Sequence, residues 1–165
     1  MDVAALFAEH HAPLFRYLAR LTGDPDSAAD AAQEAFIRLI EKPPARGHTR
    51  AWLYRVGTNA ALEAARTRSR RLVLVRDAAE RVPVGDAPAG PDEEFARSRR
   101  REQVRHALGR LNERERAVLL LREEGFSHRE IAEQVGTTTG SVGTMIARAL
   151  DKLAGELGLD EETAP

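Results

Sequence analysis

The stretch SHREIAEQVGTTTGSVGTMIARAL, residues 127–150, decides the fold of the C-terminal half. Ser127 precedes Glu130 by three residues, the spacing of a capping box, in which each side chain accepts a free backbone N–H at a helix start. Gly136 favours the left-handed turn that ends a helix. The pattern predicts a short helix that ends at Gly136 and a second helix over residues 138–157. Together they form a helix-turn-helix.

The spacing of small and apolar residues supports this motif. The two helices cross closely at its fifth position, which must be small, and its ninth position must accept a left-handed backbone, which favours glycine. With His128 as the first position, the structural positions are occupied by Ile131, Ala132, Val135, Gly136, Val142 and Met145. An ordinary helical hairpin with a turn glycine is the alternative.

A DNA-binding helix-turn-helix reads base pairs with exposed residues early in its second helix. Most of the corresponding residues here carry hydroxyls, which bond either bases or phosphates. The candidate duplex-reading residues are Thr138, Thr139, Ser141, Thr144 and Arg148.

The stretch RVPVGDAPAGPD, residues 81–92, contains three prolines and two glycines without apolar periodicity, which indicates a flexible linker. The whole segment 76–96 is acidic, with two basic and six acidic side chains. The predicted organisation is one domain over residues 1–75, this linker, a second domain over residues 97–157 and an acidic tail over residues 158–165. Because the linker has no apolar side to pack, the two domains are expected to move independently.

The N-terminal domain has room for four helices, of which three can be placed from the helical spacing of apolar residues. The first covers residues 3–21, the second runs to about Lys42 and the third covers residues 50–71. Asp24 before Pro25 is typical of an N-cap followed by the first helical residue. The later apolar residues of the second helix, expected on its buried side, are Phe36, Ile37 and Ile40.

In the C-terminal domain, two further helices precede the helix-turn-helix. Asn112 and Glu115 form a capping box that starts the second of them. The first covers residues 92–111, and its apolar side consists of Phe95, Val104 and Leu108. The predicted fold class is therefore all-α, with two small helical domains joined by a flexible linker.

Composition excludes several classes of function. The 165-residue chain has no cysteine, which rules out disulfides, thiolate nucleophiles and cysteine-ligated metals. Its five histidines lack metal-binding spacing, and no phosphate-binding glycine loop or nucleophile motif occurs, so no catalytic, metal or cofactor site is predicted. Apolar runs such as residues 3–8 and 117–121 are far shorter than the ~20 residues that span a bilayer. A cytoplasmic protein without membrane insertion is expected.

The net charge of −1 hides a segregation of charge along the chain. Residues 46–71 hold seven arginines against one glutamate, and residues 97–154 hold twelve basic against eight acidic side chains. Two basic blocks are typical of two surfaces that face a polyanion such as nucleic acid. Solvated arginine-rich helix surfaces give the same pattern and are the alternative.

Three stretches resemble sigma factors of the extracytoplasmic-function (ECF) type, the smallest relatives of sigma-70, built from regions 2 and 4 alone. DAAQEAFIRLI from Asp30 and RAWLYRVGTNAAL from Arg50 resemble successive parts of region 2. LNERERAVLLLREEGFSHREIAEQVGTTTGSVGTMIARALDKL from Leu111 resembles region 4. The resemblance covers about Leu6 to Leu153, with the motifs and the linker in the family's order.

The resemblance implies a transcription initiation subunit that is not an enzyme. Its partners would be core RNA polymerase, through the beta-prime clamp helices and the beta flap, promoter DNA and, as a regulator, an anti-sigma factor. The residues that match the polymerase-binding side of region 2.2 are Asp30, Gln33 and Glu34.

The resemblance also implies how the promoter is read. Asn59 matches the position that reads a base flipped from the minus-10 element. The other residues expected near minus-10 DNA are Arg46, Arg55, Arg66, Arg70 and Trp52, the last mainly in packing, with Arg68 and Arg71 as further phosphate contacts. The hydroxyl residues of the helix-turn-helix and Arg148 would read the minus-35 element.

Two other classes stay open. A helical sensor domain joined to a stand-alone helix-turn-helix regulator would need a ligand cavity or a dimer helix. A pure interaction protein would leave the helix-turn-helix unexplained. An enzyme is the least supported class.

Overall fold

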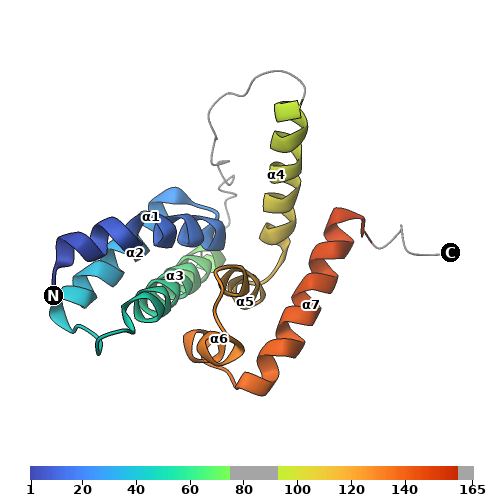
Figure 1. Cartoon of the computed structure of the whole chain (residues 1–165). Helices are drawn as coiled ribbons and strands as arrows, with labels where there is room; N and C mark the ends of the chain where they lie inside the picture. The colour runs from blue at the N-terminus through green and yellow to red at the C-terminus, as the bar shows by residue number, and fades with distance from the viewer. Residues whose placement is uncertain (75–92, 160–165) are drawn as a thin grey trace.

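The computed structural model describes residues 1–74 and 93–159, and the regular structure within these ranges is helical, with no strand (Figure 1). The helices of the N-terminal half are α1 (Val3–Thr22), α2 (Pro25–Glu41) and α3 (Thr49–Leu74). Those of the C-terminal half are α4 (Glu93–Arg110), α5 (Glu113–Glu123), α6 (His128–Val135) and α7 (Thr139–Leu157). The all-α prediction is confirmed.

Residues 75–92 and 160–165, which include most of the expected linker and acidic tail, lie outside the described residues. α4 begins at Glu93, so the end of the segment assigned to the linker is helical. The described part of the N-terminal half holds three helices rather than four, because α3 continues without a break to Leu74.

Local capping interactions set the helix ends as predicted. Asp24 accepts the backbone N–H of Ser27 at the start of α2. Gly136 ends α6 with a φ of 68°, a backbone conformation that favours glycine. The starts of α5 and α6 are the two expected capping boxes, Asn112–Glu115 and Ser127–Glu130.

The N-terminal half packs α1 and α3 onto a side of α2 that is rich in alanine. The buried residues of α2 are Ala28, Ala31, Ala32, Ala35, Phe36 and Leu39. Ile37 and Ile40 do not join them: their exposed fractions are 43% and 59%. Their predicted burial is therefore wrong, because the neighbouring Phe36 and Leu39 occupy the positions that face the core.

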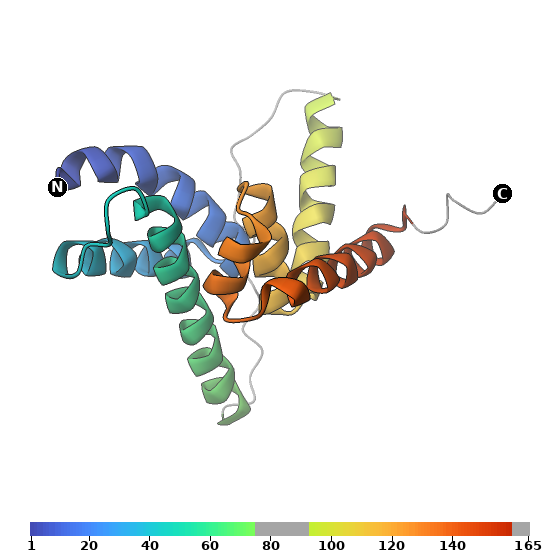
Figure 2. The ribbon, with the colours of Figure 1, turned by 60° about the horizontal axis from the view of Figure 1, so that its bottom comes forward.

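The two halves are docked on each other, contrary to the expectation of independent domains. α5 packs against α1, and α6 packs against α3 (Figures 1 and 2). One cluster of buried side chains includes Leu18 and Leu53 from the first half and Val118 and Ile131 from the second. The argument from the linker missed this docking because surfaces of α5 and α6, not the linker, provide it.

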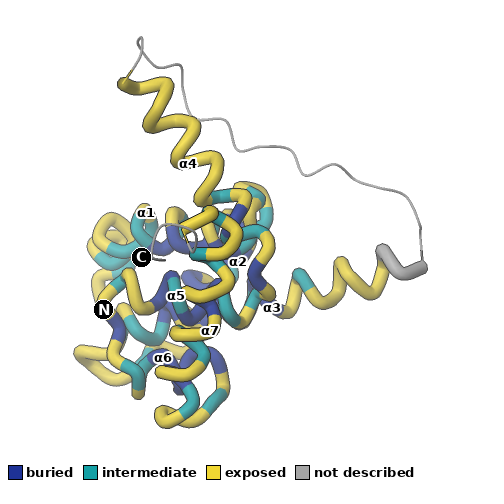
Figure 3. Tube along the Cα trace, turned by 90° about the vertical axis from the view of Figure 1, so that its right-hand side faces the viewer, coloured by how far each residue is buried: buried dark blue, intermediate teal, exposed yellow. Residues whose placement is uncertain are grey.

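Residues 63–71 of α3 and most of α4 project from the body and are largely exposed (Figure 3). Phe95 and Val104 of α4 are 65% and 37% exposed, so these members of its apolar side are not buried in the core. Only Ala107 of this helix is buried. Within the described ranges, no helix is both long enough and apolar enough to cross a membrane.

Candidate nucleic-acid and polymerase interfaces

The helix-turn-helix exposes polar side chains at the start of α7. Thr138 is the N-cap residue of α7, and its hydroxyl oxygen lies 2.7 Å from that of Ser141. Thr138, Thr139, Thr144 and Arg148 are exposed, and Ser141 is half-buried. α7 packs mainly on α4, α5 and α6, so docking of the two halves leaves these side chains accessible.

Arg114 of α5 fixes the turn between α6 and α7. Its Nη2 donates hydrogen bonds to the backbone carbonyls of Val135, at 2.8 Å, and Gly136, at 2.9 Å. Carbonyls at a helix C-terminus lack helical partners and carry partial negative charge, so a guanidinium suits them. Sequence analysis missed this role because the pairing joins two separate helices.

The residues expected at minus-10 DNA form a row along α3. Four of them are exposed, whereas Trp52 is half-buried against the core. Their separations of three, four, seven and four positions keep them on one side of a helix. The row consists of Trp52, Arg55, Asn59, Arg66 and Arg70. Arg46 lies in the loop before α3 and is also exposed.

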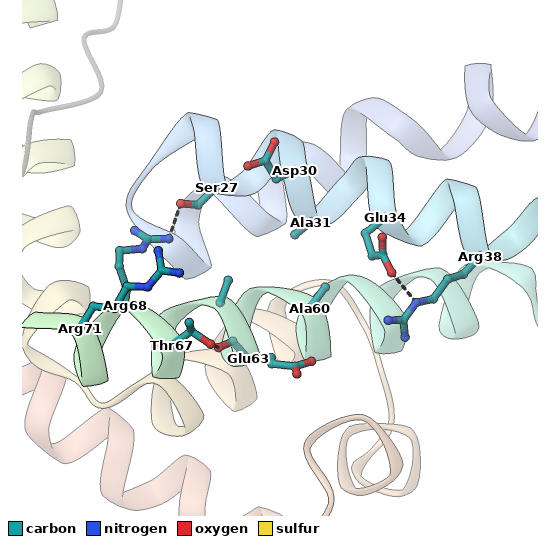
Figure 4. Close-up of a pocket in the computed structure, with 11 residues that line it drawn as sticks. Ser27, Asp30, Ala31, Glu34, Arg38, Ala60, Glu63, Thr67, Arg68 and Arg71 are labelled. Carbon is teal, nitrogen blue, oxygen red and sulfur yellow. Dashed lines mark hydrogen bonds and ion pairs between the residues drawn. The ribbon is translucent and has the colours of Figure 1, made fainter.

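A groove of about 500 Å³ is lined by residues of α2 and α3 (Figure 4). Its charged lining residues are Asp30, Glu34 and Arg38 from α2, and Glu63, Arg68 and Arg71 from α3. Glu34 accepts a hydrogen bond of 2.6 Å from Nε of Arg38. Of the predicted polymerase-binding residues, Asp30 and Glu34 therefore line the groove. Glu63, which sequence analysis did not single out, lines it from α3.

Arg68 and Arg71 line this groove instead of extending the row of Asn59. Arg68 donates to the hydroxyl of Ser27 and lies 3.9 Å from the carboxylate of Asp24. Hydrogen bonds from Ser27 and the charge of Arg68 hold the pKa of Asp24 below its ordinary value. Arg68 is thus engaged at the N-terminus of α2, which makes it less available to a phosphate than Arg66 or Arg70.

A second polar surface lies on the outer side of α2, where Gln33 is exposed outside the groove. Asp30, Gln33, Ile37 and Ile40 follow one another at separations of three, four and three positions, so they form a stripe along the helix. The stripe changes from polar to apolar toward the end of α2. Sequence analysis missed its apolar end because periodic isoleucines suggest burial.

Glu124, which directly follows α5, connects the two halves. Its carboxylate accepts hydrogen bonds from the Tyr54 hydroxyl at 2.9 Å and from Nη2 of Arg20 at 3.3 Å. Its backbone carbonyl accepts one from Nη2 of Arg50 at 2.7 Å. The neighbouring carboxylate of Glu123 accepts from Nη1 of Arg20 at 2.9 Å. Burial, and then the hydrogen bond and charge of Glu124, raise the pKa of Tyr54 well above its usual range, so its hydroxyl stays a neutral donor.

These features define a class of protein: a helical nucleic-acid-binding protein in which a helix-turn-helix half is docked on a three-helix half with an arginine-rich helix. Family comparisons agree with this class. Residues 6–71 match Sigma-70 region 2, and residues 101–153 match Sigma-70, region 4.

The ECF RNA polymerase sigma factor SigL of Mycobacterium tuberculosis is 32% identical over 163 residues, which cover 94% of this chain and 90% of SigL. RNA polymerase sigma factor YlaC of Bacillus subtilis is 27% identical over 152 residues, covering 90% of this chain and 87% of YlaC. The chain belongs to the ECF RNA polymerase sigma factors. The stand-alone regulator loses its support, because the N-terminal half matches Sigma-70 region 2.

A solved structure has the same fold. Sigma factor RpoE of Bartonella quintana, crystallised in complex with the anti-sigma factor NepR, superposes with a TM-score of 0.76. The match covers 96% of this chain and 98% of RpoE, at 22% sequence identity. The likeness therefore extends over both halves of the chain.

Proposed function

We propose that this chain is an alternative sigma subunit, which binds core RNA polymerase, recognises promoter DNA and supports its melting and the start of transcription. The observation that carries the proposal is the presence of both Sigma-70 regions, in order, on one chain whose helices expose two separate polar rows. Like other sigma factors, it has no catalytic role of its own and needs no cofactor. It works where core polymerase is, in the cytoplasm.

The polymerase contact is the stripe along α2 together with the acidic side of the groove. Separations of three and four positions suit packing against the helices of a coiled coil. Asp30, Gln33 and Glu34 meet basic and polar groups of the beta-prime clamp helices, while the exposed Ile37 and Ile40 supply apolar area. Burying two isoleucines provides affinity that exposed carboxylates alone do not.

Promoter DNA is read by two elements. Asn59 reads a melted minus-10 base, since its amide offers both a donor and an acceptor, and the arginines beside it on α3 contact phosphates. The hydroxyl residues at the start of α7 enter the minus-35 major groove with Arg148 on the backbone. The C-terminal half also meets the beta flap. An anti-sigma factor is the expected regulator, in line with the NepR-bound neighbour.

The double variant Gln33→Ala, Glu34→Lys tests the polymerase contact. We expect its affinity for core polymerase to fall at least about tenfold, through a lost polar contact and a repelling charge, while the far-ultraviolet circular dichroism stays unchanged. Glu9→Lys is the control, because Glu9 is exposed on α1, a different helix from the one that carries the stripe. Unchanged core binding in the double variant would refute the contact. Run-off transcription by core polymerase should start only when this chain is added. Transcription that is the same with and without the chain would refute the function itself.

A further inference from the structure

The carboxylates of Glu123 and Glu124 occupy a site built by the N-terminal half. Arg20 donates to both of them, with Nη1 2.9 Å from Glu123 and Nη2 3.3 Å from Glu124. The Tyr54 hydroxyl donates to Glu124 at 2.9 Å, and Nη2 of Arg50 lies 3.6 Å from the same carboxylate. Two guanidinium groups and a phenol thus converge on one anionic position.

Contacts within the first half hold part of this arrangement. Tyr54 is 1% exposed, and its ring packs on that of Tyr17 at 5.0 Å. The guanidinium of Arg50 lies over the Tyr54 ring at 5.0 Å, a cation–π contact within the same helix. Arg20 belongs to the last turn of α1, which packs against α3. These contacts lie within the first half, whereas Arg50 also contacts the Glu124 carbonyl and the Phe126 ring of the second half.

The contacts that hold the second half here are exchangeable. The side chains of Arg20 and Glu123 are 40% and 61% exposed, so their ion pair is screened by water and salt. In α6, the buried side chain of Gln134 has no hydrogen-bond partner for either its nitrogen or its oxygen among the described residues. An unpaired buried amide disfavours the packing that buries it.

Gln134 is one of the buried residues of α6, the helix of the second half that packs against α3. Exposing this helix to water would give the amide hydrogen-bond partners.

We infer that Arg20, Arg50 and Tyr54 form an anion site for a nucleic-acid phosphate, and that Glu123 and Glu124 occupy it only while the two halves are docked. The inference rests on the proposed function, in which the halves bind separate promoter elements and α5 leaves the first half. All three groups are donors at neutral pH, and arginine forks suit the paired oxygens of a carboxylate or a phosphodiester. Arg50 lies nine positions before Asn59, which places it on the other side of α3, so the phosphate that it contacts is not one of the strand that follows the row of Asn59.

The first test uses the free full-length chain and a fluorescein-labelled single-stranded oligonucleotide of mixed sequence, because a phosphate contact needs no particular sequence. Glu123→Gln with Glu124→Gln should raise the affinity about tenfold, the scale of one or two added phosphate contacts. The control, Glu102→Gln with Glu133→Gln, makes the same charge change in the same half at exposed positions. Equal gains in both double variants would show a general charge effect and overturn the inference.

The second test adds Arg20→Ala and Arg50→Ala to the Glu123, Glu124 variant and should return the affinity to that of the wild type. Arg16→Ala with Arg122→Ala, two exposed arginines outside the site, is the control and should keep most of the gain. If removing Arg20 and Arg50 lowers the affinity no more than removing Arg16 and Arg122, the inference is overturned. If the quadruple variant fails to fold by circular dichroism, Arg20→Ala alone should cancel about half of the gain.

The third test uses the holoenzyme. With Arg20→Ala and Arg50→Ala, core affinity should be unchanged, and the salt dependence of promoter binding should weaken by about two phosphate contacts. A fall in core affinity with an unchanged salt dependence would mean that the site takes a polymerase carboxylate. If core affinity and salt dependence both stay unchanged, the site takes nothing. Each of these two outcomes overturns the inference. Failure of the wild-type chain to bind core would instead reject the proposed function.

Discussion

The phenolic oxygen of Tyr54, near the start of α3, lies 2.9 Å from a carboxylate oxygen of Glu124, the C-cap residue of α5. Two residues later, the ring of Phe126 meets the Tyr54 ring edge-on at 5.1 Å, and Arg50 lies over Phe126 at 4.3 Å. Ser127, the N-cap of α6, follows directly. The start of the helix-turn-helix is therefore held against α3, the helix that carries Asn59, by contacts of Glu124 and Phe126.

Tyr54→Phe should weaken this docking. Losing a hydrogen bond to a charged acceptor lowers the free energy of unfolding by about 1–2 kcal/mol. The control is Tyr17→Phe, which removes the 2.8 Å contact with the Thr58 hydroxyl inside the first half and destabilises without undocking. Because the chain has no cysteine, two labelled cysteines, one in each half, report the separation by energy transfer. An equal response of both variants would contradict the anchoring role of Tyr54.

Gln134→Met should stabilise the protein. Both polar atoms of Gln134 are buried without a partner among the described residues, and methionine has similar volume without that desolvation cost. The free energy of unfolding, measured with urea, should rise by about 1–2 kcal/mol. Gln103→Met, on the exposed surface of α4, should leave it nearly unchanged. A loss of stability in Gln134→Met would mean that the amide contributes a favourable interaction.

The capping boxes give stability a defined pH dependence. Hydrogen bonding to Lys152 lowers the pKa of Glu115, and hydrogen bonding to Ser127 lowers that of Glu130, both from the ordinary 4.5. A carboxyl with a lower pKa in the folded state stabilises above its unfolded pKa, and this stabilisation is lost as the pH falls through the folded value.

The free energy of unfolding should therefore decline as the pH falls from about 5 to about 3. Glu130→Gln should reduce this decline by about 0.5 kcal/mol or less, because the carboxyl of Glu130 is partly exposed. Glu133→Gln, at an exposed site beside Arg129, is the control. Urea titrations at several pH values measure the slope. A steeper decline in Glu130→Gln would reverse the sign of the argument.

Sequence alone predicted the features that depend on residues a few positions apart. Ser127 with Glu130 sets the start of α6, Gly136 ends it, and the spacing of Arg55, Asn59 and Arg66 already fixes a row on α3, because each follows from local hydrogen bonding or helix geometry. The pattern of α2 indicated a helix but not which of its apolar residues faces the core.

Features that join distant parts of the chain were not predictable in this way. Tyr54 and Glu124 are 70 positions apart, and nothing in either local sequence selects the other. Arg114 likewise bonds the carbonyls of Val135 and Gly136, which are 21 and 22 positions away, and nothing in its local sequence selects them. Such contacts depend on which helix surfaces meet, and that depends on the packing of the whole chain.

Arg148→Ala should weaken binding to the minus-35 duplex without changing its sequence preference. Arg148 is exposed on α7 beyond the hydroxyl residues, where the proposed binding mode puts its guanidinium at the DNA backbone. The slope of log affinity against log salt should fall by about one phosphate contact in the holoenzyme. Arg110→Ala is the control, since Arg110 ends α4 and pairs with Glu156 at 3.6 Å. A change in base preference would instead assign Arg148 to base reading.

Asn59→Ala should impair promoter melting while leaving polymerase binding intact. Asn59 is exposed in the α3 row, whereas Leu53 and Gly57 on another side of the same helix are buried, so its truncation to alanine does not disturb packing. A side-chain amide that pairs with one base edge contributes about 1–3 kcal/mol of discrimination, so open-complex formation should fall about tenfold or more on the preferred minus-10 base. On promoters substituted at that base the loss should be smaller. Permanganate footprinting of melted thymines measures the effect, and core affinity is determined in parallel. The control is Thr67→Ala, on the α3 side of the groove between α2 and α3. Equal losses on every base would make Asn59 a general strand contact and leave base reading to another residue of the row.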